Sequence, residues 1–225
     1  RVNYPSEIKD SLKEVRVTQF YLFLPIVNGL RVMDLRFLYQ RTKHFIISPV
    51  KAWEVVHREN RPIKYVRGSY FMPLIILVSI SSLFGSLFFI NNTLKPMYSV
   101  LTGINTFLFL YIGVYASAFI VNEITRALDL GHEFLTAFKL VAYSMAPIFL
   151  SLTVSRLFES LLFINILGLY GLYIFWTGME KMINPPEHKK LPMLIATVIS
   201  MIIIFGLLQI LLSRLTETVY FALFA

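Results

Sequence analysis

The 225-residue sequence contains no cysteine, so neither a disulfide framework nor a thiolate metal site can form. Charged residues are also scarce, at 15% of the chain, whereas 56% of the residues are hydrophobic. A soluble domain of this size carries about 25% charged residues, so the composition predicts a polytopic membrane protein. The histidines are scattered without the spacing of metal ligands, and we expect no metal and no cofactor: His44, His57, His132 and His188.

Signature motifs of the large enzyme classes are missing as well. The sequence has no Walker loop, no Gly-rich dinucleotide turn, no nucleophile elbow and no pair of intramembrane acids. Phosphoryl transfer, hydride transfer and serine hydrolysis therefore lack their minimum parts, and we expect a protein that is not an enzyme. The sequence also lacks a basic, then apolar, then small-residue pattern, so we expect no cleavable export signal.

Long apolar runs dominate the rest of the composition. Five of them approach the ~20 residues that a helix needs to cross a ~30 Å hydrocarbon core. Lipid offers no partner to backbone N–H and C=O groups, which favours helices over irregular chain. The prediction is an all-α integral membrane protein with a bundle of five transmembrane helices, at about residues 70–90, 100–121, 137–157, 161–176 and 191–212.

Charge divides the chain into two regions. Residues 1–69 hold 13 of the 21 Lys and Arg and 6 of the 13 Asp and Glu, which leaves a net charge of +7 ahead of the first apolar run. Basic residues concentrate on the cytoplasmic side of membrane proteins, so this asymmetry indicates topology rather than nucleic-acid binding. We expect a cytoplasmic or interfacial region at 1–69, a five-span domain at 70–225, a cytoplasmic N-terminus and a C-terminus on the opposite side.

The N-terminal region contains two short amphipathic segments. Residues 19–30 are apolar but too short to span, so a surface-lying or re-entrant segment is expected there. In the second segment, Ser48 and Pro49 suit the start of a helix that places Val50, Trp53 and Val56 on one face. We expect this helix to lie in the cytoplasmic headgroup layer, with Trp53 at the boundary.

Polar residues gather in the third and fourth spans. The stretch KLVAYSMAP, residues 139–147, combines hydroxyls with a proline that leaves a backbone carbonyl without its helical donor. In the fourth span, hydroxyls share one helix face, and Gly171 and Gly178 form a smooth strip where another helix can approach. Two readings stay open, a packing kink and a polar pocket for water, a lipid headgroup or a small solute, formed by Tyr143, Ser144, Pro147, Tyr170, Tyr173 and Thr177.

Other residues are candidates for contacts at the membrane surface. Lys139 is expected to snorkel to the cytoplasmic interface. Glu123 and Arg126 are three apart and can pair at the end of the second span, in a region that is either a solvated loop or a surface for a cytoplasmic partner. A basic series ahead of the first span either sets topology or attracts anionic lipid: Arg58, Arg61, Lys64 and Arg67.

In combination, three fragments resemble the Yip family, the Ypt/Rab-interacting multi-span proteins of the eukaryotic secretory pathway, and in particular its bacterial members. They are SPVKAWEVV at 48–56, FKLVAYSMAP at 138–147 and ILGLYGLYIFWTGMEKM at 166–182. The motif that precedes the first span in the eukaryotic branch is not found here. The resemblance implies a five-span fold with a cytoplasmic N-terminus, a role in membrane organisation or trafficking and a location in the bacterial inner membrane.

Two functions are expected from these features. The first is a scaffold or adaptor that binds a membrane or cytoplasmic protein, or a second copy of itself, through the N-terminal region and loops. The second is a lipid or small-solute binding protein or transporter that uses the polar pocket between the third and fourth spans. Mid-span positions carry Asn, Ser and Tyr without Asp, Glu, Lys or Arg, which argues against ion-coupled transport.

Overall fold

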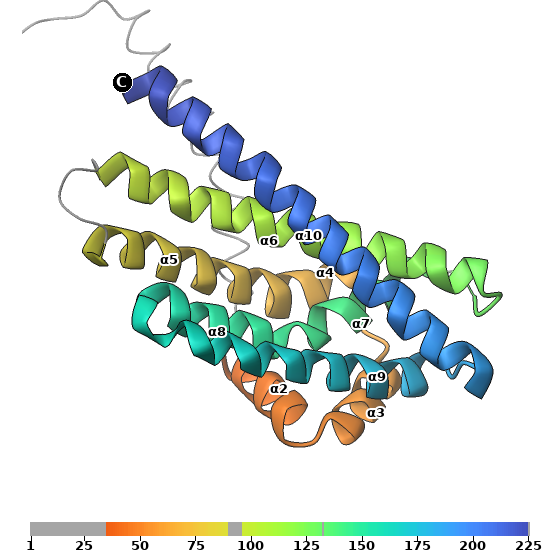
Figure 1. Ribbon diagram of the computed structural model, residues 1–225. Helices are drawn as coiled ribbons and strands as arrows, with labels where there is room; N and C mark the ends of the chain where they lie inside the picture. Colours follow the sequence, from red (N-terminus) through yellow and green to blue (C-terminus); the bar gives the residue numbers. More distant parts are fainter. Residues whose placement is uncertain (1–34, 90–95, 132, 225) are drawn as a thin grey trace, which may run out of the picture.

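The computed structural model describes residues 35–89, 96–131 and 133–224 (Figure 1). The described residues form helices joined by short turns, and none of them forms a strand. The all-α architecture predicted from the sequence is therefore confirmed for this part of the chain. The apolar segment 19–30, for which a surface-lying or re-entrant position was predicted, lies outside the described residues.

Four helices are long and apolar enough to cross a membrane, and a bent pair can form a fifth span. The first continuous stretch joins α4 (Ile63–Val66), η1 (Arg67–Phe71) and α5 (Met72–Phe89). The remaining elements are α6 (Pro96–Ala127), the bent pair α7 (Phe134–Ser144) and α8 (Ala146–Leu157), η2 (Glu159–Leu169) leading into α9 (Tyr170–Met182), and α10 (Glu187–Phe224).

Two of the helices are much longer than the lipid requires. With 32 residues, α6 extends about 48 Å, and α10 with 38 residues extends about 57 Å. A hydrocarbon core is only ~30 Å thick. The predicted spans 100–121 and 191–212 lie within these helices, so α6 continues past its apolar run by one to two turns at each end and α10 by about one turn at its start and three at its end.

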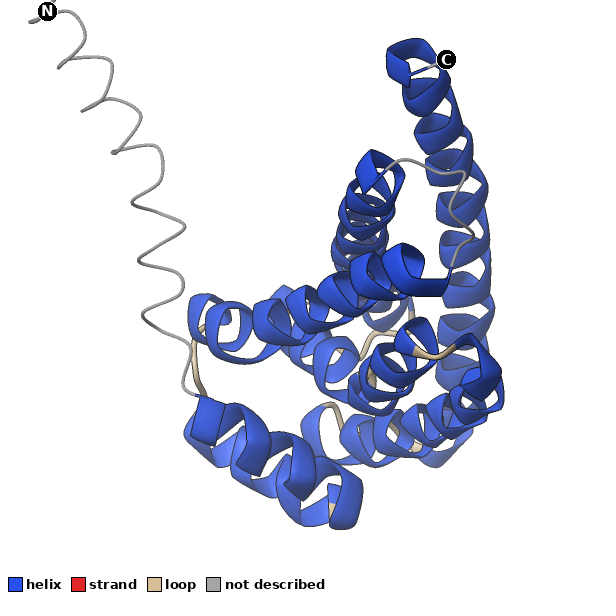
Figure 2. Ribbon diagram, turned by 90° about the vertical axis from the view of Figure 1, so that its left-hand side faces the viewer, coloured by secondary structure: helices blue, strands red, loops and turns tan. Residues whose placement is uncertain are grey.

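The helix α6 lies between α5 and α10 in the bundle (Figures 1 and 2). On one side, Gly113 leaves room for the ring of Phe205, which would collide with a side-chain carbon at position 113. Away from α6, α10 exposes a row of large apolar side chains: Ile195, Ile199, Ile202, Ile203, Leu207, Ile210 and Leu211. Such a surface fits contact with lipid tails, because a face of this kind would be unfavourable in water.

Two helices precede the spans and pack on them from one side. They are α2 (Leu35–Ile47) and α3 (Pro49–Glu59), along the lower edge of Figure 1. The predicted start of α3 is confirmed, with Ser48 at the N-cap and Pro49 in the first turn, although the Ser48 side chain forms no capping hydrogen bond. The partners of α3 are α2 and α9, and α2 also contacts η1, α7 and α8.

The predicted orientation can be measured directly by cysteine labelling, because the sequence contains no cysteine of its own that would react. In right-side-out cells or spheroplasts, we expect Ala127→Cys and His188→Cys to resist a membrane-impermeant maleimide and Ser160→Cys to react. All three positions are exposed, so burial does not explain a difference. Labelling of His188→Cys but not Ser160→Cys would reverse the orientation, and labelling of all three would contradict the five-span arrangement.

Candidate functional site

The third span is broken at Met145, inside the stretch that the sequence singled out. Here α7 ends at Ser144, α8 begins at Ala146, and the two axes differ by 42°. Pro147 has no N–H, so it cannot donate to the carbonyl of Tyr143 four residues earlier. The helix-breaking residues therefore mark a discontinuity of the span, as the kink reading predicted.

The first span carries a second irregularity, a π-helical turn at Arg67–Phe71. Such turns are rare, interrupt the regular ladder of an α-helix and often occur at functional sites. This one places Tyr70 against Tyr143 of the third span, with ring centroids 4.5 Å apart. The two irregular segments thus face each other across the helix bundle.

Four aromatic rings meet between these segments, and we call them the aromatic cluster: Phe45, Trp53, Tyr70 and Tyr143. The ring of Phe45 stacks on Tyr143 with centroids 4.7 Å apart. Trp53 meets Phe45 and Tyr143 edge-on, at 4.9 and 5.9 Å. No ring is more than 1% exposed. Since each such pair contributes about 0.5–1.5 kcal/mol beyond burial, the cluster binds α2 and α3 to the spans.

Trp53 also forms a hydrogen bond to the fourth span. Its indole N–H donates a hydrogen bond of 2.9 Å to the carbonyl of Ile174 in α9. The prediction that Trp53 lies at the lipid boundary is wrong, because its side chain is fully buried among protein groups. The apolar face of α3 packs against α9 instead of lying on headgroups, and Val50 at its edge is 38% exposed.

Glycine at position 178 makes this docking feasible. A side-chain carbon there would collide with the Trp53 ring and with Leu140. Two turns earlier, a side-chain carbon at Gly171 would lie 2.6 Å from the carbonyl oxygen of Ser144. The prediction that these glycines allow close helix approach is confirmed, with α7 as one neighbour and α3 as the other.

The hydroxyls of the fourth span do not join Tyr143 in one pocket. Tyr170 donates a hydrogen bond of 3.0 Å to the carbonyl of Ile46 in α2, and Tyr173 is 49% exposed. Thr177 donates to carbonyls of its own helix. Ser144 is buried on α7, and its hydroxyl finds no hydrogen-bond partner among the described residues.

The physical reason is a competition between two stripes on α9. Tyr170, Tyr173 and Thr177 form one stripe, and Gly171, Ile174 and Gly178 form another, one residue and therefore about 100° further round the helix. Since glycines allow the closest backbone approach, the second stripe takes the inner position. Tyr170 and Tyr173 are rotated towards the bundle surface, whereas Thr177 remains buried.

An ion-pair network joins the two N-terminal helices. The Arg41 guanidinium lies 2.5 Å from a Glu59 carboxylate oxygen, and the Arg61 Nε lies 2.8 Å from the same oxygen. Arg61 also sits over the ring of Tyr65, 4.2 Å from its centroid. The Arg41 side chain is only 6% exposed, so removing Glu59 would leave a buried charge without its partner, which is strongly destabilising.

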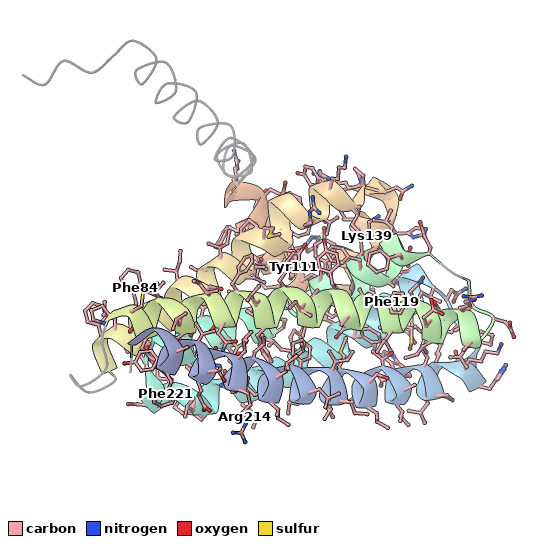
Figure 3. The ribbon with its side chains drawn as sticks, turned by 90° about the horizontal axis from the view of Figure 1, so that it is seen from above. Phe84, Tyr111, Phe119, Lys139, Arg214 and Phe221 are labelled. Carbon is pink, nitrogen blue, oxygen red and sulfur yellow. The ribbon has the colours of Figure 1, made fainter. Side chains whose placement is uncertain are left out.

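Lys139 lies inside the protein rather than at the lipid interface. Its side chain is 2% exposed on α7, beside the N-terminal helices (Figure 3). The snorkelling position predicted for it is therefore wrong, because α4 packs against α7 and the N-terminal helices occupy this side of the bundle. Glu59 and Glu133 are the acidic residues whose charges act on its ammonium group.

Two exposed ion pairs occupy the end of the bundle that carries α3. The pair predicted between Glu123 and Arg126 is present, with 3.6 Å between nitrogen and oxygen. A second pair joins Glu54 of α3 to Lys181 of α9 at 3.0 Å. The hydrogen bond and charge of Lys181 lower the pKa of Glu54 below its ordinary value. Among the described residues, no group of three or more His, Asp or Glu could hold a metal ion.

Sequence reasoning missed two of the four rings of the aromatic cluster and the ion pair beside them. Phe45 and Tyr70 belong to the aromatic cluster, and Arg41 and Glu59 form the ion pair beside it. One signal was available, because Arg41 and Phe45 are four residues apart and must share a helix face. That spacing shows a common face but does not show that the face is buried.

A comparison with known families matches one family, described as the Yip1 domain, over residues 43–208. The matched region begins in α2 and ends within α10, so it includes the aromatic cluster, the first four spans and most of the fifth apolar run. No curated protein and no solved structure matches the chain.

Substitution of Gly178 tests the docking of α3. We expect Gly178→Ala to lower the free energy of unfolding by about 1–3 kcal/mol, the usual cost of overpacking a tight contact. Gly206→Ala is the matched control in α10, where a side-chain carbon would meet nothing within 4 Å. Thermal unfolding in detergent measures both variants. Equal midpoints for Gly178→Ala and the parent chain would contradict the described contact between α3 and α9.

The Glu54–Lys181 pair predicts a pH dependence with a definite sign. The folded-state pKa of Glu54 is lowered, so its stabilising effect is present above the ordinary carboxyl pKa and is lost as pH falls through the lowered value. The loss is small and salt-sensitive because both side chains are exposed.

Thermal unfolding measured across the acid range checks this dependence. Glu54→Gln should show a smaller acid-side loss of stability than the parent chain, whereas the control Glu187→Gln leaves the Glu54–Lys181 pair intact and should keep that contribution. An acid-side loss of the same size in Glu54→Gln and in the parent chain would show that the pair does not cause it.

Proposed function

We propose that this chain, which belongs to the Yip1 domain family, is a membrane-embedded scaffold or adaptor in membrane organisation or trafficking. It presents a fixed platform, built from α3 and the adjoining ends of α6, α9 and α10, to a protein partner. With the proposed cytoplasmic N-terminus, this platform faces the cytoplasm, and the membrane is the bacterial inner membrane. The bilayer itself is the second partner.

The observation that carries this proposal is the division of α3 into two faces. Ala52, Trp53 and Val56 are buried against the spans, whereas Lys51 and Arg58 are exposed on the opposite side. A helix that is fixed by its inner face and charged on its outer face holds its polar groups in a constant arrangement. Such preorganisation lowers the entropic cost of binding a partner.

The interior of the bundle supports a scaffold better than a transporter. Phe71 contacts Tyr111, Tyr115, Phe138 and Phe149, with ring centroids between 5.7 and 6.2 Å. Phe71, Phe138 and Phe149 are fully buried. At the level of Phe71, large rings thus fill the space between the first, second and third spans, where a solute path would need polar groups or water.

Photocrosslinking from defined positions tests the platform. A photoreactive amino acid at Arg58, on the outer face of α3, should give a protein adduct of discrete mass in native membranes. The same amino acid at Ile203, which is 54% exposed on α10, should give lipid adducts only. Introducing Trp53→Ala should weaken the Arg58 adduct, because it removes the ring that docks α3.

Native mass spectrometry of the gently purified protein should show the same partner in a fixed stoichiometry. A second copy of this chain would be recognised by its mass, and it would identify the platform as a self-association surface. Lipid adducts alone from Arg58, with no protein retained after gentle purification, would overturn the scaffold proposal.

A further inference from the structure

The helix α2 exposes apolar side chains and buries a charge, which is the reverse of a helix that faces water. Arg41 is 6% exposed and paired to Glu59, while Tyr39 and Ile47 are each 66% exposed. Lys43 lies on the exposed side, with its ammonium 5.9 Å from the centroid of the Tyr39 ring. A Lys beside a Tyr on an apolar surface is typical of the boundary between headgroups and acyl chains.

Two apolar grooves run from this exposed side of α2 to the spans. The larger, of about 500 Å³, lies between α2, α5 and α8, and its walls include Leu38, Ile46, Ile47, Leu74, Leu77 and Leu150. The smaller, of about 260 Å³, lies between α2, α8, η2 and α9, and its walls include Ile46, Pro147, Leu150, Val154, Leu167 and Tyr170. Ile46 and Leu150 belong to both, so the two grooves diverge from a shared wall.

We propose that these grooves bind one phospholipid of the leaflet on the side of the N-terminal helices, with its phosphate at Lys43 and one acyl chain in each groove. This site goes beyond the proposed scaffold function and does not depend on it. Under the proposed orientation, the leaflet is the cytoplasmic one.

The direction of the grooves fits acyl chains that descend from a headgroup. Along α5, the larger groove passes from Leu74 to Leu77, one and two turns beyond Tyr70 in the direction of the far end of the bundle. Along α8, the smaller groove passes from Pro147 to Val154 in the same direction. Both tracks therefore lead away from α2. The larger groove runs towards the middle of the first span, and the smaller groove runs from the middle of the third span towards its far end.

The charge at the entrance favours an anionic headgroup. The sequence of α2, LRFLYQRTKHFII, contains three Lys and Arg residues and no Asp or Glu. Arg41 is neutralised by Glu59, but no carboxylate of the described side chains forms an ion pair with Lys43. A basic side chain near an anionic membrane surface attracts anionic lipid, which makes phosphatidylglycerol a suitable probe.

The first test fills the larger groove and uses a matched control. Leu77 and Leu87 lie on the same helix and are both 43% exposed, but only Leu77 lines a groove. The protein is reconstituted in vesicles of phosphatidylcholine and phosphatidylglycerol at 3:1, extracted in mild detergent and examined by native mass spectrometry. We expect the parent chain and Leu87→Trp to retain one phospholipid, and Leu77→Trp to bind it about tenfold more weakly.

A second variant avoids the risk that Leu77→Trp disturbs folding. Ile47 is 66% exposed at the rim of the larger groove, so Ile47→Trp blocks the groove without entering the core. It should reduce phospholipid retention at an unchanged thermal unfolding midpoint. Retention of phospholipid by both Ile47→Trp and Leu77→Trp, at the level of the parent chain, would overturn the proposed site.

The headgroup contact is tested separately. Lys43→Gln should keep a bound phospholipid but lose its preference for phosphatidylglycerol over phosphatidylcholine. Lys51→Gln also removes one positive charge, but on the exposed face of α3, and it should keep that preference. Two results would show that the protein holds annular lipid only and would overturn the proposal. One is retained lipid with the 3:1 composition of the vesicles in every variant. The other is a loss of phospholipid in Leu87→Trp as large as that in Leu77→Trp. Arg58 lines neither groove, so the crosslinking result is independent of this outcome.

Discussion

Trp53 donates its indole N–H to the carbonyl of Ile174 across a space that stays open because residue 178 is glycine. The aromatic cluster forms around this contact, and it fixes both N-terminal helices to the spans. The outer face of α3 can serve as the proposed platform only because its inner face is held in this way. The position of α2, and with it the two grooves, depends on the stacking of Phe45 on Tyr143.

Two irregular helical segments lie where these contacts occur. A π-helical turn in the first span and a proline break in the third bring Tyr70 and Tyr143 together. Regular helices at both positions would point these rings in other directions, since one extra residue in a turn rotates the rest of the helix by about 100°. Free backbone groups are costly in lipid. The π-helical turn and the proline break lie under the N-terminal helices, so their free backbone groups lie next to protein rather than next to acyl chains.

The surface of the molecule divides according to its surroundings. The far side of α10 and the outer side of α2 expose large apolar residues, whereas α3 and the ends of α6 and α9 expose ion pairs. Arg214 projects from the outer side of α10 (Figure 3). The proposed protein contact and the proposed lipid contact thus lie on separate surfaces, which allows the two proposals to be tested one at a time.

The sequence by itself determined the helical class, the apolar runs that become spans, the start of α3 at Pro49 and the family resemblance. These properties depend on local composition and on periodicity along one helix, which a sequence displays directly.

Tertiary structure decided the rest. The sequence predicted an amphipathic α3, but only the approach of α9 showed that its Trp53 faces protein instead of headgroups. On α9, two stripes one residue apart were both suited to face inward, and close packing at Gly171 and Gly178 selected the glycine stripe. Which of two neighbouring helix faces packs inward depends on the helix that packs against it. The sequence of one helix carries no information about the position of that neighbouring helix.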